Sequence, residues 1–159
     1  MSTISISGDE KYIITCSLQT DYAILWDLRK KEQVTYFTHP SSQNSYGCED
    51  SEFLPLEEKL VISWSGGDIQ IINTRSWKID KELSIEAWPA TAQIEYSKEL
   101  KTLILGTNGG ELYSWTFGSK EIINLKKFDD TNITAMDLRK RKLLIGLKSG
   151  GIIGAHVRE

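Results

Sequence analysis

Few residue patterns in this protein indicate catalysis or metal binding. The 159 residues contain two cysteines, Cys16 and Cys48, and two histidines, His39 and His156. A zinc site needs Cys or His ligands at close spacing, and the two histidines, His39 and His156, lie far apart in the sequence. With one histidine at each place, no catalytic triad can be drawn either. We therefore expect no metal site, no catalytic residues and no cofactor-binding residues.

The two cysteines have a simple interpretation at this stage. Small secreted scaffolds contain many more cysteines than Cys16 and Cys48 provide here. We interpret both as reduced, buried, small apolar side chains of a cytosolic protein.

Two glycine-rich segments look at first like phosphate-binding loops. They begin at Ser65 with SGGD and at Thr107 with TNGG. Both lack the lysine and the following helix that a phosphate loop requires, and both recur in register along the chain. Glycine pairs supply the positive φ angles that tight hairpins need, so we predict hairpin turns here.

Two charged clusters leave a functional role open. Glu49, Asp50 and Glu52 could bind calcium or act as acid and base only if other loops added ligands. A solvated entry to a strand is the simpler interpretation. The basic run RKRK, Arg139 to Lys142, could contact RNA or acidic protein tails. We expect it to form a charged hairpin turn, with partner binding as the alternative.

Composition and charge narrow the range of partners and compartments. The hydrophobic fraction is 40%, the charged fraction is 26% and the net charge is -3, with a pI near 5.5. These values are typical of a globular protein and disfavour nucleic acid or an anionic membrane as the main partner. No apolar run approaches the roughly 18 residues of a membrane span, and MSTISISGDE at the N-terminus has no signal-peptide pattern. We expect a cytoplasmic protein, with association with a cytoskeletal or ciliary assembly left open.

The elements that must position any site are organised as an internal repeat. A turn followed by an apolar strand occurs four times, as TDYAILWD (20–27), GGDIQIIN (66–73), GGELYSWT (109–116) and GGIIGAHV (150–157). The next-to-last positions of these segments recur at intervals of 46, 43 and 41 residues, at Trp26, Ile72, Trp115 and His156. Such a period indicates a repeat architecture.

Each repeat contains further short apolar segments. Two of them precede each turn-and-strand segment: ISIS and YIITCS, CEDSEFL and KLVISWS, AQIEYS and KTLILGT, and ITAMDL and RKLLIGL. A fourth segment follows in the first three repeats, as EQVTYF, KIDKELSI and KEIINL, and none is expected in the last. These β-branched and aromatic residues favour strands, and no sustained helical periodicity is present. We predict an all-β protein of about fifteen strands.

A four-stranded unit of this length whose third strand ends in Trp-Asp resembles a blade of the WD-repeat β-propeller family. The resemblance covers the whole chain and is strongest at AILWDLRKKEQVTYF, residues 23–37. It implies that Trp26 packs between neighbouring blades and that Asp27 caps the turn into LRKK. It also implies a single partial propeller domain over residues 1–159, with blades over about 1–38, 39–84, 85–126 and 127–159.

The signature residues of that family are incomplete in this chain. Repeats two to four replace the Trp-Asp pair, and the family's Gly-His dipeptide is missing throughout. Thr38-His39 is the nearest counterpart of that dipeptide. The family's hydrogen-bond network therefore survives only as fragments, Asp21 with Trp26 in the first blade and His39 with Asp68 in the second.

The number of repeats predicts an incomplete ring. Propellers of this family usually close with seven or eight blades, and this chain supplies about four, the last of them incomplete. The strands are apolar on both faces, so the first and last repeats each present a face without a neighbour inside the chain. We expect the ring to be completed by another polypeptide, by blades of a longer protein or by a second copy. Closure of four blades on themselves is the alternative.

The resemblance implies a non-enzymatic scaffold that binds protein partners within a larger complex. The candidate contact residues lie in two loop segments, THPSSQNSYG and EAWPAT. We single out His39, Tyr46 and Trp88, because function concentrates on loops and aromatic side chains often anchor partners. Packing inside the loop or over the seam between blades is the structural alternative for these residues.

A second class of function stays open beside the scaffold. A regulatory propeller, attached to an enzyme or binding a small ligand in its central channel, would need polar groups that converge from the inner strands. Ser5, Glu95 and Asp137 are examples from different repeats. A ligand-dependent rise in thermal stability would favour this alternative.

Overall fold

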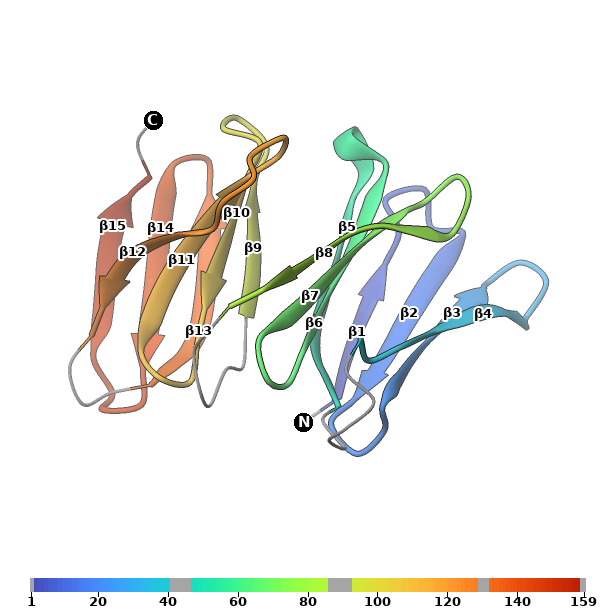
Figure 1. Cartoon of the computed structure of the whole chain (residues 1–159), viewed down its shortest axis with the longest axis horizontal. Coiled ribbons are helices and arrows are strands. Elements are labelled where there is room, and N and C mark those ends of the chain that lie inside the picture. Colours follow the sequence, from blue (N-terminus) through green and yellow to red (C-terminus); the bar gives the residue numbers. More distant parts are fainter. Residues whose placement is uncertain (1, 41–46, 86–92, 129–131, 158–159) are drawn as a thin grey trace. The chain divides into compact units, whose positions relative to one another are not determined.

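The computed structural model describes residues 2–40, 47–85, 93–128 and 132–157. These ranges contain fifteen β-strands and one short 3-10 turn at Pro55–Glu57, so the all-β prediction is confirmed (Figure 1). The strands form four antiparallel sheets, in which strands that follow one another in the sequence pair with one another. Residue contacts divide the chain into two units, 1–84 and 85–159, and each unit is described on its own.

The first unit contains two four-stranded sheets. The first sheet consists of β1 (Ser2–Ile6), β2 (Tyr12–Ser17), β3 (Tyr22–Asp27) and β4 (Glu32–Thr38). The second sheet consists of β5 (Cys48–Leu54), β6 (Lys59–Trp64), β7 (Asp68–Asn73) and β8 (Lys78–Ser84).

The second unit contains one four-stranded and one three-stranded sheet. The third sheet consists of β9 (Gln93–Ser97), β10 (Thr102–Gly106), β11 (Glu111–Thr116) and β12 (Ile123–Lys127). The fourth sheet consists of β13 (Ile133–Arg139), β14 (Lys142–Leu147) and β15 (Ile152–His156). The predicted pattern of three four-stranded repeats and one shorter repeat is confirmed for the described ranges.

Backbone conformation at the turns explains why these segments fold as short meanders. The first hairpin of every sheet turns through one non-glycine residue at positive φ, namely Glu10, Glu58, Lys101 and Lys140. The second hairpins of the last three sheets use glycine instead, with φ of 95° at Gly66, 78° at Gly110 and 87° at Gly150. Because glycine adopts these angles without steric cost, SGGD and TNGG form the predicted hairpin turns.

The two sheets of the first unit share one apolar core. Ile14 and Leu25 of the first sheet are fully buried, as are Leu60, Ile62 and Trp64 of the second sheet, and all five belong to the same cluster. Alternation along each strand directs these side chains to one face. The first strands meet in this arrangement, because β5 lies beside β1 and β2.

The second unit repeats this arrangement with other residues. Ile104 and Leu112 of the third sheet are buried together with Ile133, Leu143 and Ile145 of the fourth. The first strands meet again, because β13 lies beside β9. In both units, therefore, consecutive sheets pack with first strand next to first strand.

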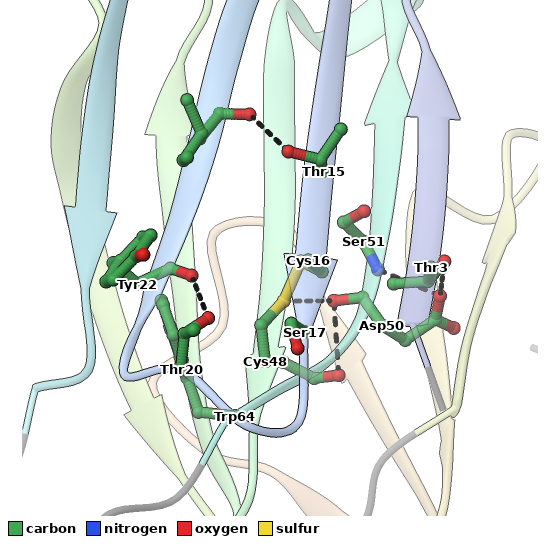
Figure 2. Close-up of a disulfide and its surroundings, with 12 residues drawn as sticks. Thr3, Thr15, Cys16, Ser17, Thr20, Tyr22, Cys48, Asp50, Ser51 and Trp64 are labelled. Atoms are coloured by element: carbon green, nitrogen blue, oxygen red, sulfur yellow. Dashed lines mark hydrogen bonds between the residues drawn. A yellow bond between two sulfur atoms is a disulfide. The ribbon is translucent and has the colours of Figure 1, made fainter.

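The cysteines correct one expectation from the sequence. Cys16 of β2 and Cys48 of β5 are joined by a disulfide, so the interpretation of both as reduced thiols is wrong (Figure 2). Their burial was predicted correctly, since 4% of Cys16 and 0% of Cys48 is exposed. The two residues belong to different sheets, and only the packing of β2 against β5 brings their Cα atoms to 5.2 Å. That distance lies within the range that a disulfide requires.

Candidate interaction surfaces

His39 is buried at the junction between the first and second sheets. Only 8% of the residue is exposed. Its backbone N–H donates to the Asp21 carbonyl oxygen at 2.9 Å, and its Nε2 lies 2.9 Å from the carbonyl oxygen of Ser65. Nε2 also lies 3.9 Å from a carboxylate oxygen of Asp68, and the ring packs edge-on against Trp64. His39 and Asp68 are therefore close, but the hydrogen-bond partner of Nε2 is the Ser65 carbonyl oxygen and not the predicted Asp68 carboxylate.

Gln70 extends this network into the interior of the second sheet. Its side-chain oxygen accepts a hydrogen bond from the Trp64 indole at 3.1 Å. Its side-chain nitrogen donates to the Thr38 carbonyl at 3.2 Å and to Glu82 at 2.9 Å. Gln70 is 2% exposed, so its side chain has little access to water. These bonds supply the hydrogen-bond partners that a buried amide needs. The network fixes the end of β4 to β6, β7 and β8.

The other predicted fragment has a different partner in the structure. The indole nitrogen of Trp26 donates to the Thr15 hydroxyl at 3.1 Å. Asp27 caps the following turn as expected, because one carboxylate oxygen accepts from the backbone N–H groups of Arg29 and Lys30, each at 2.9 Å. The bond from Lys30 is the main cause that lowers the pKa of Asp27.

The predicted contact residues are not brought together by the described structure. Tyr46 and Trp88 lie outside the described residues. His39 lies inside, and its ring nitrogen faces the Ser65 carbonyl and the Asp68 carboxylate. Its burial gives His39 a role in positioning the segment between the two sheets.

The charged clusters have structural roles in the described ranges. Asp50 accepts hydrogen bonds from its neighbour's backbone at Ser51 and from the Thr3 hydroxyl of β1 (Figure 2). Glu49 accepts a hydrogen bond from the Ser65 hydroxyl. The basic run occupies the hairpin between β13 and β14, where all four side chains are exposed, as predicted from the sequence.

The polar residues considered for a channel ligand have local contacts. The Glu95 carboxylate accepts a hydrogen bond from the backbone N–H of Leu138 at 3.2 Å. Asp137 lies 3.2 Å from the Arg139 guanidinium. Ser5 belongs to the other unit, on β1 opposite Ile14.

One face of the first sheet presents large apolar side chains to solvent. The pairing register places Ile4, Ile6, Ile13, Tyr22, Ile24, Trp26 and Tyr36 on the face turned away from the second sheet, which we name the outer face of the first sheet. Ile4 is 64% exposed, Ile6 55% and Tyr36 59%. An exposed apolar area of this kind commonly marks an interaction site.

The fourth sheet has a corresponding face of different composition. Its register places Ala135, Asp137, Arg139, Lys142, Leu144, Gly146, Ile152, Gly154 and His156 on the face turned away from the third sheet, which we name the outer face of the fourth sheet. Ile152 is 78% exposed and Leu144 is 50% exposed. Two large apolar side chains therefore project from a face of small and charged residues. The number of repeats, with strands apolar on both faces, predicted that the first and last repeats would each have an unpartnered face, but it did not identify the exposed residues.

A groove of about 560 Å³ lies between the third and fourth sheets. Ile123 and Leu125 of β12 line the groove, as do Ala155 of β15 and Val157 directly after it. Within the described ranges β15 pairs only with β14, so its second edge has no strand partner. An open strand edge beside apolar side chains can accept an added strand.

Comparison with protein-family models and with curated proteins finds no match for this chain. Among the described residues, no group of three or more His, Cys, Asp or Glu side chains is arranged to hold a metal ion. In the same part of the chain, no helix is long and apolar enough to cross a bilayer.

Proposed function

We propose that the chain is a partial WD-repeat β-propeller that serves as a non-enzymatic scaffold for protein partners. The observation that supports this most strongly is the repeated meander sheet with first strand packed next to first strand in both units. In a propeller, each blade is such a sheet, and the first strands line the central axis. The Trp-Asp end of β3 and its capped turn are the local features that agree with this family.

The roles of the polar residues favour a scaffold over an enzyme. His39, Asp50 and Gln70 use their side chains to join strands and loops within the first unit. Glu95 does the same in the second unit. A catalytic group needs a polar atom directed toward a substrate site, and these atoms are directed toward the protein's own backbone and side chains.

The outer faces of the first and fourth sheets favour a larger assembly. A propeller of seven or eight blades covers both faces of every blade, whereas here two faces present exposed isoleucines. Further blades from another chain, from a longer protein or from a second copy would cover them. Protein partners then bind the loops between strands, where Tyr46 and Trp88 remain the proposed contacts.

The disulfide between Cys16 and Cys48 bears on the cellular compartment of the protein. Disulfides are rare in the cytosol, where glutathione and thioredoxin keep thiols reduced. The disulfide therefore does not support the expected cytoplasmic location, and that location, with its cytoskeletal or ciliary association, stays a prediction. The oxidation state of Cys16 and Cys48 in cells would test it.

Electron microscopy of the purified assembly tests the proposed architecture. We expect four-stranded sheets arranged radially around one axis. Sheets joined into one continuous sandwich would contradict the propeller.

Partner capture and ligand screening test the proposed function. A tagged chain should recover a protein in a fixed molar ratio, and the variant Tyr46→Ala with Trp88→Ala should lose it while its melting temperature is unchanged. A panel of nucleotides and metabolites should leave that temperature unchanged. A rise of several degrees with one ligand, without a stoichiometric protein, would instead support the regulatory propeller.

A further inference from the structure

We propose that the outer face of the first sheet binds the outer face of the fourth sheet of a second copy of this chain. The inference rests on the proposed propeller, because it extends the packing of consecutive sheets from one chain to the next. It names the partner that covers the two open faces.

The packing rule for consecutive sheets is visible at the first hairpins of the first unit. A Cβ atom placed on Gly8, in the turn between β1 and β2, would lie 2.8 Å from Cγ of Pro55, in the turn between β5 and β6. The two turns are therefore side by side. Pro55 and Gly8 also line one small pocket together with Tyr12 and Trp77.

The second unit obeys the same rule along its first strands. Gln93 of β9 donates its side-chain amide to the Thr134 carbonyl of β13 at 2.7 Å. Glu95 of β9 accepts the N–H of Leu138 of β13 at 3.2 Å. Within each unit, therefore, the two sheets meet along their first strands, and in the first unit their first hairpins also lie side by side.

Applied to two copies, this rule brings an acidic turn next to a basic one. The first hairpin of the fourth sheet, Arg139 to Lys142, would lie beside the first hairpin of the first sheet in the other copy. That hairpin contains Asp9, Glu10 and Lys11, with Lys11 ion-paired to Asp9, and its net charge is -1. Opposite charges at adjacent turns attract and set the register of the contact. Two equal basic or two equal acidic turns would repel.

The charge of each unit agrees with this orientation. The first unit has eight Lys and Arg against thirteen Asp and Glu, a net charge of -5, and the second has eleven against nine, a net charge of +2. The unit that carries the first face is therefore acidic as a whole, and the unit that carries the other face is basic as a whole. A second copy offers a unit of opposite charge to each of them, whereas an anionic membrane or nucleic acid would match only the basic unit.

The shapes of the two faces also favour this pairing. Ala135, Gly146 and Gly154 on the fourth sheet leave room for the large side chains of the first sheet. Leu144 and Ile152 project from the same face toward an apolar partner. Each copy carries both faces, so the proposed dimer requires two equivalent contacts related by a two-fold axis.

Sedimentation velocity on the 159-residue chain tests the association. We expect a dimer of twice 18.0 kDa, about 36 kDa. The variants Ile4→Asp and Ile152→Asp each damage one face, and each should be a monomer. Leu56→Asp is the matched control, because Leu56 is 73% exposed on the 3-10 turn and belongs to neither face, so this variant should remain a dimer.

Mixing the two damaged variants distinguishes this head-to-tail contact from a contact between like faces. The Ile4→Asp chain keeps an intact fourth sheet and the Ile152→Asp chain keeps an intact first sheet. Their mixture should therefore form a heterodimer with one remaining contact. Failure of the mixture to associate, with both variants folded by circular dichroism, would overturn the inference.

A charge exchange gives an independent test with little risk to folding. Glu10 and Lys140 occupy equivalent positive-φ positions in the first hairpins of their sheets. The same position holds Glu58 in the second sheet and Lys101 in the third, so it accepts either residue type. Glu10→Lys and Lys140→Glu should each weaken dimerisation at least severalfold, and the double variant should recover it. A monomeric wild-type chain whose sheets still show radial packing would refute the second copy and leave the scaffold proposal standing. Sheets without radial packing would refute the scaffold proposal itself.

Discussion

The indole N–H of Trp64 donates to the side-chain oxygen of Gln70 at 3.1 Å, and both residues are buried within the second sheet. The same glutamine donates to the Thr38 carbonyl, at the end of the first sheet. One polar side chain thus connects the two sheets of the first unit through the interior. A buried polar group with all its partners stabilises a fold, and the loss of one partner is costly.

Replacement of this glutamine should destabilise the first unit. Gln70→Ala removes three hydrogen bonds and leaves the Trp64 N–H buried without its acceptor, so we expect a loss of about 2–4 kcal/mol in the free energy of unfolding. Urea denaturation followed by tryptophan fluorescence measures this change. Gln33→Ala, at an exposed position of β4, is the control and should change stability by no more than about 0.5 kcal/mol. Equal effects of the two variants would contradict the role of the network.

The disulfide should stabilise the first unit by lowering the conformational entropy of the unfolded chain. Cys16 and Cys48 are separated by 32 residues, and closing a loop of that length restricts the unfolded state by about 3–4 kcal/mol. The variant Cys16→Ala with Cys48→Ala should lose about this much stability in guanidinium denaturation. Its stability should not respond to dithiothreitol, whereas that of the wild-type chain should. Two free thiols per chain in the untreated native protein would show that the bond is not formed.

Gly47 should tolerate no side chain. A Cβ atom at this position would overlap the backbone of Leu18 and the carbonyl oxygen of Ser17, and backbone atoms cannot move aside cheaply. Gly47→Ala should therefore cost about 1–3 kcal/mol or more. Gly109→Ala is the control, since the nearest atoms to its Cβ would be side-chain atoms of Thr107 and Glu111, at 3.5 Å or more. Thermal melts should show a large shift for the first variant and little or none for the second.

Asp9 should make the first hairpin sensitive to acid. A hydrogen bond from the Lys11 side chain, together with one from Ser7, lowers the pKa of Asp9 from 3.8 to about 2. Because the pKa is lower in the folded state, the carboxylate stabilises the fold above pH 3.8, and this contribution is lost as the pH falls through about 2. Nuclear magnetic resonance of the Asp9 carboxyl carbon should give a midpoint near 2. A midpoint near 3.8 would mean that the turn contacts do not persist in solution.

The strands could be predicted from the sequence because their signals are local. Apolar alternation and glycine turns recur at a regular interval, and each strand pairs with its neighbour in sequence. The cap at Asp27 was predicted from the family resemblance, since the turn LRKK follows it directly.

Contacts between sheets could not be predicted in the same way. Nothing near Cys16 or Cys48 indicates that β2 and β5 face each other, so the disulfide was missed. Gln70 lies between isoleucines in the strand DIQIIN. From the sequence alone, a glutamine at this position is equally compatible with an exposed strand edge and with a buried hydrogen-bond network. The burial of His39 depends on the same packing, because its partners come from three other segments of the unit.

The bond between Cys16 and Cys48 encloses β3 and β4 in a covalent ring. A protease that cuts the chain anywhere between these two residues would leave both pieces attached to each other. Such a nicked protein would run as a single species until a reductant separated it, so β1 and β2 would stay anchored to the rest of the molecule after cleavage.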